Sequence, residues 1–262
     1  MINAIYQFLQ ARAREMALTL PKPAFYSFHD AAIRRADETL SSHAVIKKCR
    51  AYLDASQLEC AHGLCHCEAV ARDAGALVLI EASAKGIHAE ELDQLFLAAE
   101  LAGLLHDTKR KEKDHALLGS IEADKILSAI GIADRYRKFI TDAIRNHEAF
   151  KEALDSDSVG GRLVSDSLYD ADKFRWGPEN FTTTLWIMVE DRSTPIETLH
   201  QTFRENMKKI ERIKDTFRTA TGKRHGPEFI DQGITIGNAI FEEMSAILKG
   251  DASVNSHPEN GL

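Results

Sequence analysis

Histidine and aspartate side chains occur along this chain at positions where they could bind a divalent metal ion. His106 and Asp107 directly follow the most apolar stretch of the sequence, residues 95–105. An imidazole and a carboxylate supply two ligands of the types that transition metals bind, and leaving such groups buried without a partner is costly. We therefore expect a metal at this pair, and further ligands elsewhere in the sequence.

The dipeptide alone is weak evidence, because His29 and Asp30 repeat it. That copy follows an aromatic segment at an expected helix start, where Asp30 or Ser27 is expected to serve as the N-cap. The pair at His106 and Asp107 differs because an apolar helix precedes it and because further histidine and aspartate residues lie on both sides. Its context, and not the dipeptide itself, indicates a metal site.

The remaining ligand candidates are spread over the sequence. His62 and His66 are four residues apart and share one helix face, so either could reach a metal. His115 and His147 each adjoin an amphipathic segment, and Asp172 is flanked by apolar residues that should turn it inward. Taken singly, His115 could instead be an exposed residue at a helix start, and His147 could close a helix C-terminus.

This ordered series resembles the HD-domain superfamily of metal-dependent phosphohydrolases, whose signature is H…HD…D on consecutive core helices. The resemblance covers about residues 60–176. The ligands implied are His66, His106, Asp107 and Asp172, with His115 and His147 added in members that bind two ions. In such members Asp107 would bridge the two ions. His62 would lie beside the first ligand, His66, where it faces the substrate or orients a ligand.

The chemistry implied is hydrolysis of a phosphate ester or phosphoanhydride by metal-activated hydroxide. One ion lowers the pKa of a bound water, and two ions about 3.5–4 Å apart can share a hydroxide. Imidazole and carboxylate ligands suit one or two ions of manganese, iron, zinc, nickel or cobalt. Asp107 is then central to catalysis. Arg110, on a similar helix face, is the first candidate for a phosphate contact, although it lies in an exposed charge run, residues 109–114. Lys109, Lys111 and Arg145 are further cationic candidates, and Lys173 and Arg175, near Asp172, are weaker ones.

The expected substrate is a small phosphorylated molecule such as a nucleotide. Known subfamilies fit poorly. The acidic pair that follows the dipeptide in guanosine tetraphosphate hydrolases is replaced by residues 109–111, and the glutamate of deoxynucleotide 5′-phosphatases is Arg110 here. The Gly-Tyr-Pro element of cyclic-di-GMP phosphodiesterases is absent after His147.

Two alternatives to a phosphohydrolase stay open. One is a diiron oxygenase of the same fold, which requires His115 and His147, and the other is a non-catalytic nucleotide-binding regulator.

Composition limits the partners of the chain. Its 262 residues, 44% of them hydrophobic, can bury a sizeable core. The formal charge of -7 argues against a nucleic-acid polymer as partner, because such binding needs a basic face. No apolar run approaches a membrane span, and residues 1–20 do not resemble a signal peptide, so we expect a cytoplasmic protein that does not bind membranes.

Four cysteines lie close together in the sequence: Cys49, Cys60, Cys65 and Cys67. We expect them to be reduced, buried thiols, as is typical of a protein outside oxidising compartments. On a single helix, Cys60 and Cys67 would lie roughly opposite His62 and His66. A closed cysteine metal site is therefore not expected.

Apolar residues recur at spacings of three and four, and alternating runs are missing, so we expect an all-α fold, by resemblance an HD-domain helical bundle with additional N- and C-terminal helices. Helices are expected at residues 2–18, 25–40, 41–55, 60–85, 90–107, 114–130, 134–148, 160–175, 181–191, 195–219 and 227–249. Residues 1–55 should pack on a metal-binding core at 56–180, residues 181–250 should complete the same domain, and residues 251–262 should form a flexible tail. The apolar stripe in residues 196–217 favours packing onto the domain, with a homodimer seam as the alternative.

Overall fold

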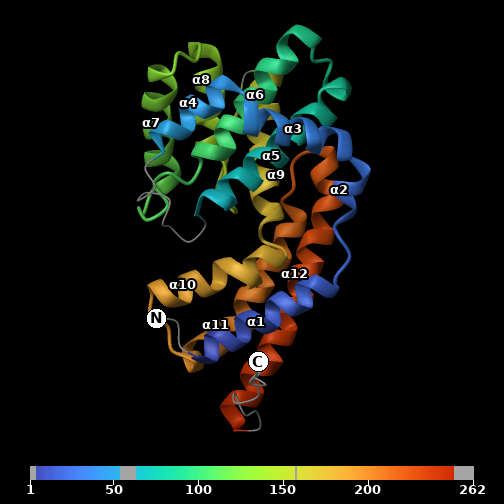
Figure 1. Cartoon of the computed structure of the whole chain (residues 1–262), viewed down its shortest axis with the longest axis vertical. Coiled ribbons are helices and arrows are strands. Elements are labelled where there is room, and N and C mark those ends of the chain that lie inside the picture. The colour runs from blue at the N-terminus through green and yellow to red at the C-terminus, as the bar shows by residue number, and fades with distance from the viewer. Residues whose placement is uncertain (1–3, 54–62, 157, 251–262) are drawn as a thin grey trace, which may run out of the picture. The chain divides into compact units, whose positions relative to one another are not determined.

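The computed structural model describes residues 4–53, 63–156 and 158–250, and this part of the chain is helical without any strand. The all-α prediction is confirmed. No helix in these residues combines the length and the apolar character needed to cross a membrane. The α-helices (Figure 1) are α1 (Ala4–Thr19), α2 (Ala24–Phe28), α3 (Asp30–Ser42), α4 (Ala44–Tyr52), α5 (Gly63–Glu81), α6 (Ala89–Leu105), α7 (His115–Ala129), α8 (Asp134–Arg145), α9 (Val159–Phe174), α10 (Leu185–Asp191), α11 (Ile196–Glu211) and α12 (Ala220–Lys249). Short helical turns are η2 (Ser83–Lys85), η3 (Asn180–Thr184) and η4 (Arg212–Asp215).

The chain divides into two compact units. The first, here called the core unit, comprises residues 22–175 and 213–229 and contains α2 to α9 with the start of α12. The second unit comprises residues 1–21, 176–212 and 230–262, with α1, α10, α11 and the remainder of α12. The expected assignment of residues 1–55, 56–180 and 181–250 to N-terminal helices, metal-binding core and C-terminal helices stays a prediction. The expected tail at 251–262 lies outside the described residues.

The core unit is built around α5, α6 and α9, which pack on one another (Figure 1). Helix α6 is central because its second half is apolar on every side except at Glu100, and all but one of its residues from Leu95 to Leu105 are buried. Helices α7 and α8 pack on each other, and α8 also packs on α6 and α9. This packing carries the C-terminal end of α6 into the interior, where polar side chains need partners.

The second unit buries the apolar stripe of α11. Leu199, Phe203, Met207 and Ile210 are all buried, and the ring of Phe203 lies 6.0 Å from that of Phe241 on α12. These residues belong to the same unit. For α11, the prediction that the stripe packs within the protein is confirmed.

Two local predictions at His29 are wrong. The helix expected over 25–40 is interrupted there, with α2 ending at Phe28 and α3 beginning at Asp30. His29 itself occupies the N-cap position of α3, so neither Asp30 nor Ser27 does. Instead the Ser27 hydroxyl donates to the Ala24 carbonyl, and Asp30 pairs with Arg34 one turn later. Because both side chains bind these local partners, neither caps the backbone N–H groups at the start of α3.

The expected boundary between the helices at residues 195–219 and 227–249 is also wrong. The helix expected to continue to residue 219 ends at Glu211, and Pro227 lies inside α12, which begins at Ala220. An interior proline costs about 3 kcal/mol by itself. Here α12 packs closely at the preceding glycine, where an added Cβ would stand 2.3 Å from the ring of Phe217. Tertiary packing thus overrides the local preference.

The cysteines that the structure describes are free thiols. Cys49 and Cys67 are buried as expected, whereas Cys65 is exposed, which corrects its prediction. Cys65 lies in the first turn of α5 beside Leu64, which is also exposed, whereas the next residues, His66 and Cys67, turn toward the interior. Cys60 lies outside the described residues. Among the described residues, no candidate metal group contains a cysteine.

Candidate metal centre

His106 and Asp107 follow the last residue of α6 and are both buried. His106 keeps helical backbone angles at the C-cap, and its Nδ1 lies 2.7 Å from the Gly103 carbonyl oxygen. A carbonyl only accepts, so Nδ1 carries the proton and Nε2 presents its lone pair on the opposite side of the ring. His106 Nε2 lies 3.7 Å from Asp107 Oδ2, and within the described residues it has no hydrogen-bond partner.

The first candidate group consists of His66, His106 and Asp107, whose ligand atoms all lie within 4.8 Å of one another. His66 comes from the first turns of α5, and its ring lies 5.3 Å from that of His106. Asp172, near the end of α9, adds a second carboxylate: its Oδ1 lies 3.6 Å from His66 Nε2 and 3.8 Å from His106 Nε2. Imidazole nitrogens and carboxylate oxygens thus converge on one place.

A second candidate group shares Asp107 with the first and adds His115 and His147. His115 is the first residue of α7, and His147 follows the end of α8. His147 Nδ1 contacts the Ile144 carbonyl at 2.6 Å, so its Nε2 faces inward, 3.6 Å from Asp107 Oδ1 and 3.3 Å from His115 Nε2. These buried groups could hold metal ions.

Two cations contact the centre. The guanidinium of Arg110 places one nitrogen 3.0 Å from His115 Nε2 and another 3.8 Å from Asp107 Oδ2. Lys173 is buried on α9, where its ammonium pairs with Asp172 and donates to the His147 carbonyl at 2.8 Å. Arg110 was predicted to face a substrate, whereas the contact between Lys173 and Asp172 was not predicted. A lysine adjacent to a ligand aspartate in a buried helix is the one sequence signal for it.

The pKa values of the carboxylates follow from these contacts. Burial by itself raises the pKa of Asp107, but His106, His147 and Arg110 outweigh it and hold the pKa well below the usual range. Burial likewise raises the pKa of Asp172. Lys173, His66 and His106 outweigh this effect and hold the pKa well below the usual range. Both carboxylates are therefore ionised and able to act as ligands at neutral pH.

The pKa values of His106 and His115 are both lowered, which favours their neutral form. Burial is the largest cause that lowers the pKa of His106 to about 4. Burial, together with the neighbouring His147 and Arg110, also lowers the pKa of His115. Neutral imidazole is the form that binds metal. The centre therefore presents its ligand atoms in the protonation states that a divalent ion needs.

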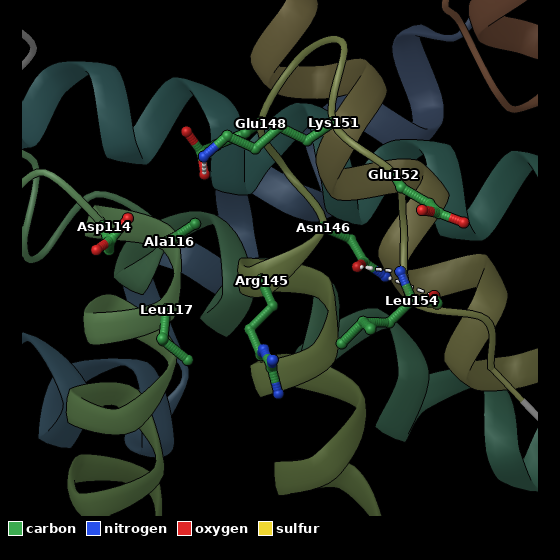
Figure 2. A pocket seen from close by; sticks show the side chains of 9 residues that line it. All are labelled: Asp114, Ala116, Leu117, Arg145, Asn146, Glu148, Lys151, Glu152 and Leu154. Carbon is green, nitrogen blue, oxygen red and sulfur yellow. Dashed lines mark hydrogen bonds and ion pairs between the residues drawn. The ribbon is translucent and has the colours of Figure 1, made fainter.

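A cavity of about 200 Å³ is lined by the chain neighbours of His115 and His147, although not by these two histidines themselves. Figure 2 shows residues from the start of α7, the end of α8 and the loop after it around this cavity, including both neighbours of His147 in the chain. The Asn146 side chain fixes that loop, because its amide donates to the Leu154 carbonyl at 2.9 Å and its oxygen accepts from the Leu154 N–H at 2.8 Å. Glu148 also lies near the group, with Oε1 3.9 Å from His115 Nδ1, a contact that the sequence did not predict.

The other predicted residues lie elsewhere. His62 lies outside the described residues. Lys109 is half-buried and Lys111 exposed, and Arg175 pairs with Asp73 and donates to Tyr26, so it does not join the centre. The second dipeptide is separate: the His29 ring packs on Phe25 and His225.

Comparison of the chain with protein-family models, with curated proteins and with solved structures finds no match.

Proposed function

We propose that this chain is a metal-dependent phosphohydrolase of the HD type, acting on a small phosphorylated molecule such as a nucleotide. The observation that supports it best is the convergence of four residues that are far apart in the sequence: His66, His106, Asp107 and Asp172. Their order and their positions on α5, α6 and α9 agree with the H…HD…D pattern. The expected fold of an HD-domain bundle is part of the same proposal.

The residues present fit a metal ion. His106 Nε2 and Asp107 Oδ1 are buried, and within the described residues neither has a hydrogen-bond partner. Such groups are costly unless a ligand satisfies them. The donors are imidazole nitrogens and carboxylate oxygens, which suit manganese, iron, zinc, nickel or cobalt. His66, His106, Asp107 and Asp172 would hold the ion.

The residues around the ion have distinct tasks in phosphate hydrolysis. When bound, a divalent ion supplies a Lewis acid that acidifies water and polarises a phosphoryl oxygen. Lys173 fixes Asp172 in position through their ion pair. Arg110, half-exposed beside Asp107, neutralises phosphoryl oxygens through its fixed donors. The cavity next to His147 receives the group that the phosphate esterifies.

The test combines metal analysis of the purified protein with a phosphate-release screen over nucleotides, sugar phosphates and pyrophosphate. Asp107→Ala should lose bound metal and at least about a hundredfold in rate, because it removes a ligand. Asp30→Ala is the matched control, since it alters the other His-Asp dipeptide at an exposed residue and should leave activity unchanged. Full activity in Asp107→Ala with metal still bound would exclude the mechanism.

One observation favours a second function. Because His115 and His147 form a second group with Asp107, the centre has enough ligand atoms for the diiron oxygenase alternative. That enzyme would contain iron and consume oxygen in the presence of a polyol or phosphonate. Metal-dependent phosphate release without oxygen uptake would exclude it as the main activity. Nucleotide binding without turnover would indicate the regulator instead.

A further inference from the structure

The contact between Arg110 and His115 bears on how many ions the centre binds. Arg110 Nη1 lies 3.0 Å from His115 Nε2. A guanidinium is always protonated and can only donate, so His115 Nε2 must accept this hydrogen bond with its lone pair. A neutral imidazole has one such lone pair. His115 Nε2 therefore cannot serve Arg110 and a metal ion at the same time.

His147 makes the same place attractive to a cation. Its Nδ1 donates to the Ile144 carbonyl, so its Nε2 also presents a lone pair, 3.3 Å from His115 Nε2. Two ring nitrogens this close repel each other when both rings are neutral acceptors, unless a proton or a positive group lies between or beside them. Arg110 is that group among the described residues, and it also lies 3.8 Å from the carboxylate of Asp107.

The charges of the centre agree with a single ion. Its two carboxylates, Asp107 and Asp172, already face one cation each, Arg110 and Lys173. The histidine ligands add no negative charge when neutral. One divalent ion thus brings the centre to a net charge of about +2, and a second would bring it to about +4 before any substrate binds. Two buried divalent ions about 3.5–4 Å apart repel each other strongly when too little negative charge surrounds them.

We propose that Arg110 takes the place of a second metal ion, so that the chain binds one divalent ion, at His66, His106, Asp107 and Asp172. His115 then positions the guanidinium over Asp107, where it faces the phosphoryl group of the substrate, and His147 packs behind His115. This inference rests on the proposed metal centre but is independent of the substrate. It also separates the two functions considered above, because an oxygenase with two irons needs both groups for metal.

The experiment is a titration of metal-free protein with Co²⁺, followed by absorbance and checked by elemental analysis after gel filtration. We expect one equivalent in the unaltered chain and two in Arg110→Gln, which frees His115 Nε2. Adding His115→Ala to Arg110→Gln should return the value to one, which separates a specific second site from adventitious binding. His115→Ala alone should leave one equivalent.

Lys113→Gln is the matched control, because it removes the same charge from the same segment at an exposed residue. It should bind one equivalent. Two equivalents in the unaltered chain, or one in a folded Arg110→Gln protein, would overturn the inference and leave the phosphohydrolase proposal standing. A chain that binds no Co²⁺ in any form would overturn the metal centre and the inference together. Circular dichroism establishes that each variant is folded.

Discussion

Gly103 on α6 lies directly against the backbone of Ala71 on α5. A Cβ added to Gly103 would stand 2.3 Å from the Ala71 Cα and 2.5 Å from its nitrogen, distances that no packed structure tolerates. The Gly103 carbonyl also accepts the hydrogen bond from His106 Nδ1. This one glycine therefore sets both the approach of the two helices and the orientation of His106.

Gly103→Ala should consequently damage the centre as well as the packing. The methyl group must push α6 away from α5 and so separate His106 from His66. We expect a loss of about 1–3 kcal/mol in the free energy of unfolding, as for other overpacked cores, and at least a tenfold loss in metal affinity. Urea unfolding and a metal titration measure the two effects. Unchanged metal affinity would show that the helix approach does not set the distance between the two histidines.

The sequence predicted the main features of the centre because they depend on local pattern. The apolar run before His106 makes α6 a buried helix, and a polar pair at its end must then lie inside. Of the other four predicted metal ligands, His66 and Asp172 lie beside that pair, and His115 and His147 form the second group with Asp107. Order along the chain was sufficient because each ligand lies at or near the end of a helix.

The rest depends on tertiary contacts that spacing does not encode. Arg110 and Lys173 have long side chains, and spacing in the sequence does not fix which rotamers they adopt. Arg110 turns to His115, and Lys173 turns to the neighbouring Asp172 and to the His147 carbonyl on another segment. Helix α12 continues through Pro227 where Gly226 packs against the ring of Phe217. Neither effect has a periodic signal that would appear in a single sequence.

Lys173→Met tests the buried ion pair with Asp172. In the metal-free protein this change leaves Asp172 buried without its cation, which should cost about 3–5 kcal/mol. A bound divalent ion compensates the same carboxylate, so added Mn²⁺ should raise the melting temperature of Lys173→Met more than that of the unaltered chain. Thermal unfolding with Mn²⁺ and with a chelator measures the difference.

Lys138→Met serves as the comparison, because it breaks an exposed pair with Asp142 that should be worth less than about 1 kcal/mol. Equal metal-induced shifts in Lys173→Met and the unaltered chain would argue that the ion does not contact Asp172.

Asn146→Ala tests the loop beside the cavity. It removes both hydrogen bonds to the Leu154 backbone and the one to the Ser165 hydroxyl, so we expect a loss of about 1–3 kcal/mol in stability. Because the loop lines the cavity and not the metal group, KM for a substrate found in the screen should rise several-fold with kcat nearly unchanged. Asn206→Ala, at an exposed residue of α11, should change neither. A fall in kcat alone would place Asn146 in the chemistry instead.

Glu100 gives the fold a pH dependence of its own. It lies on α6 with its side chain fully buried, and within the described residues neither carboxyl oxygen has a hydrogen-bond partner. Burial raises its pKa from 4.5 to about 9, and the nearby Arg35 and Arg50 oppose this only in part. The carboxyl is therefore protonated in the folded chain at neutral pH but ionised in the unfolded chain.

The folded state then binds one proton more than the unfolded state between these two pKa values, so stability falls as the pH rises through that window. The loss amounts to roughly 3 kcal/mol between pH 4.5 and pH 7. Glu100→Gln has no proton to lose and should remove this slope, whereas Glu90→Gln, exposed on the same helix, should keep it. Urea unfolding from pH 5 to pH 9 measures the slopes directly. A slope that persists in Glu100→Gln would mean that another buried group, such as Asp170, whose pKa burial raises to about 7, binds the proton instead.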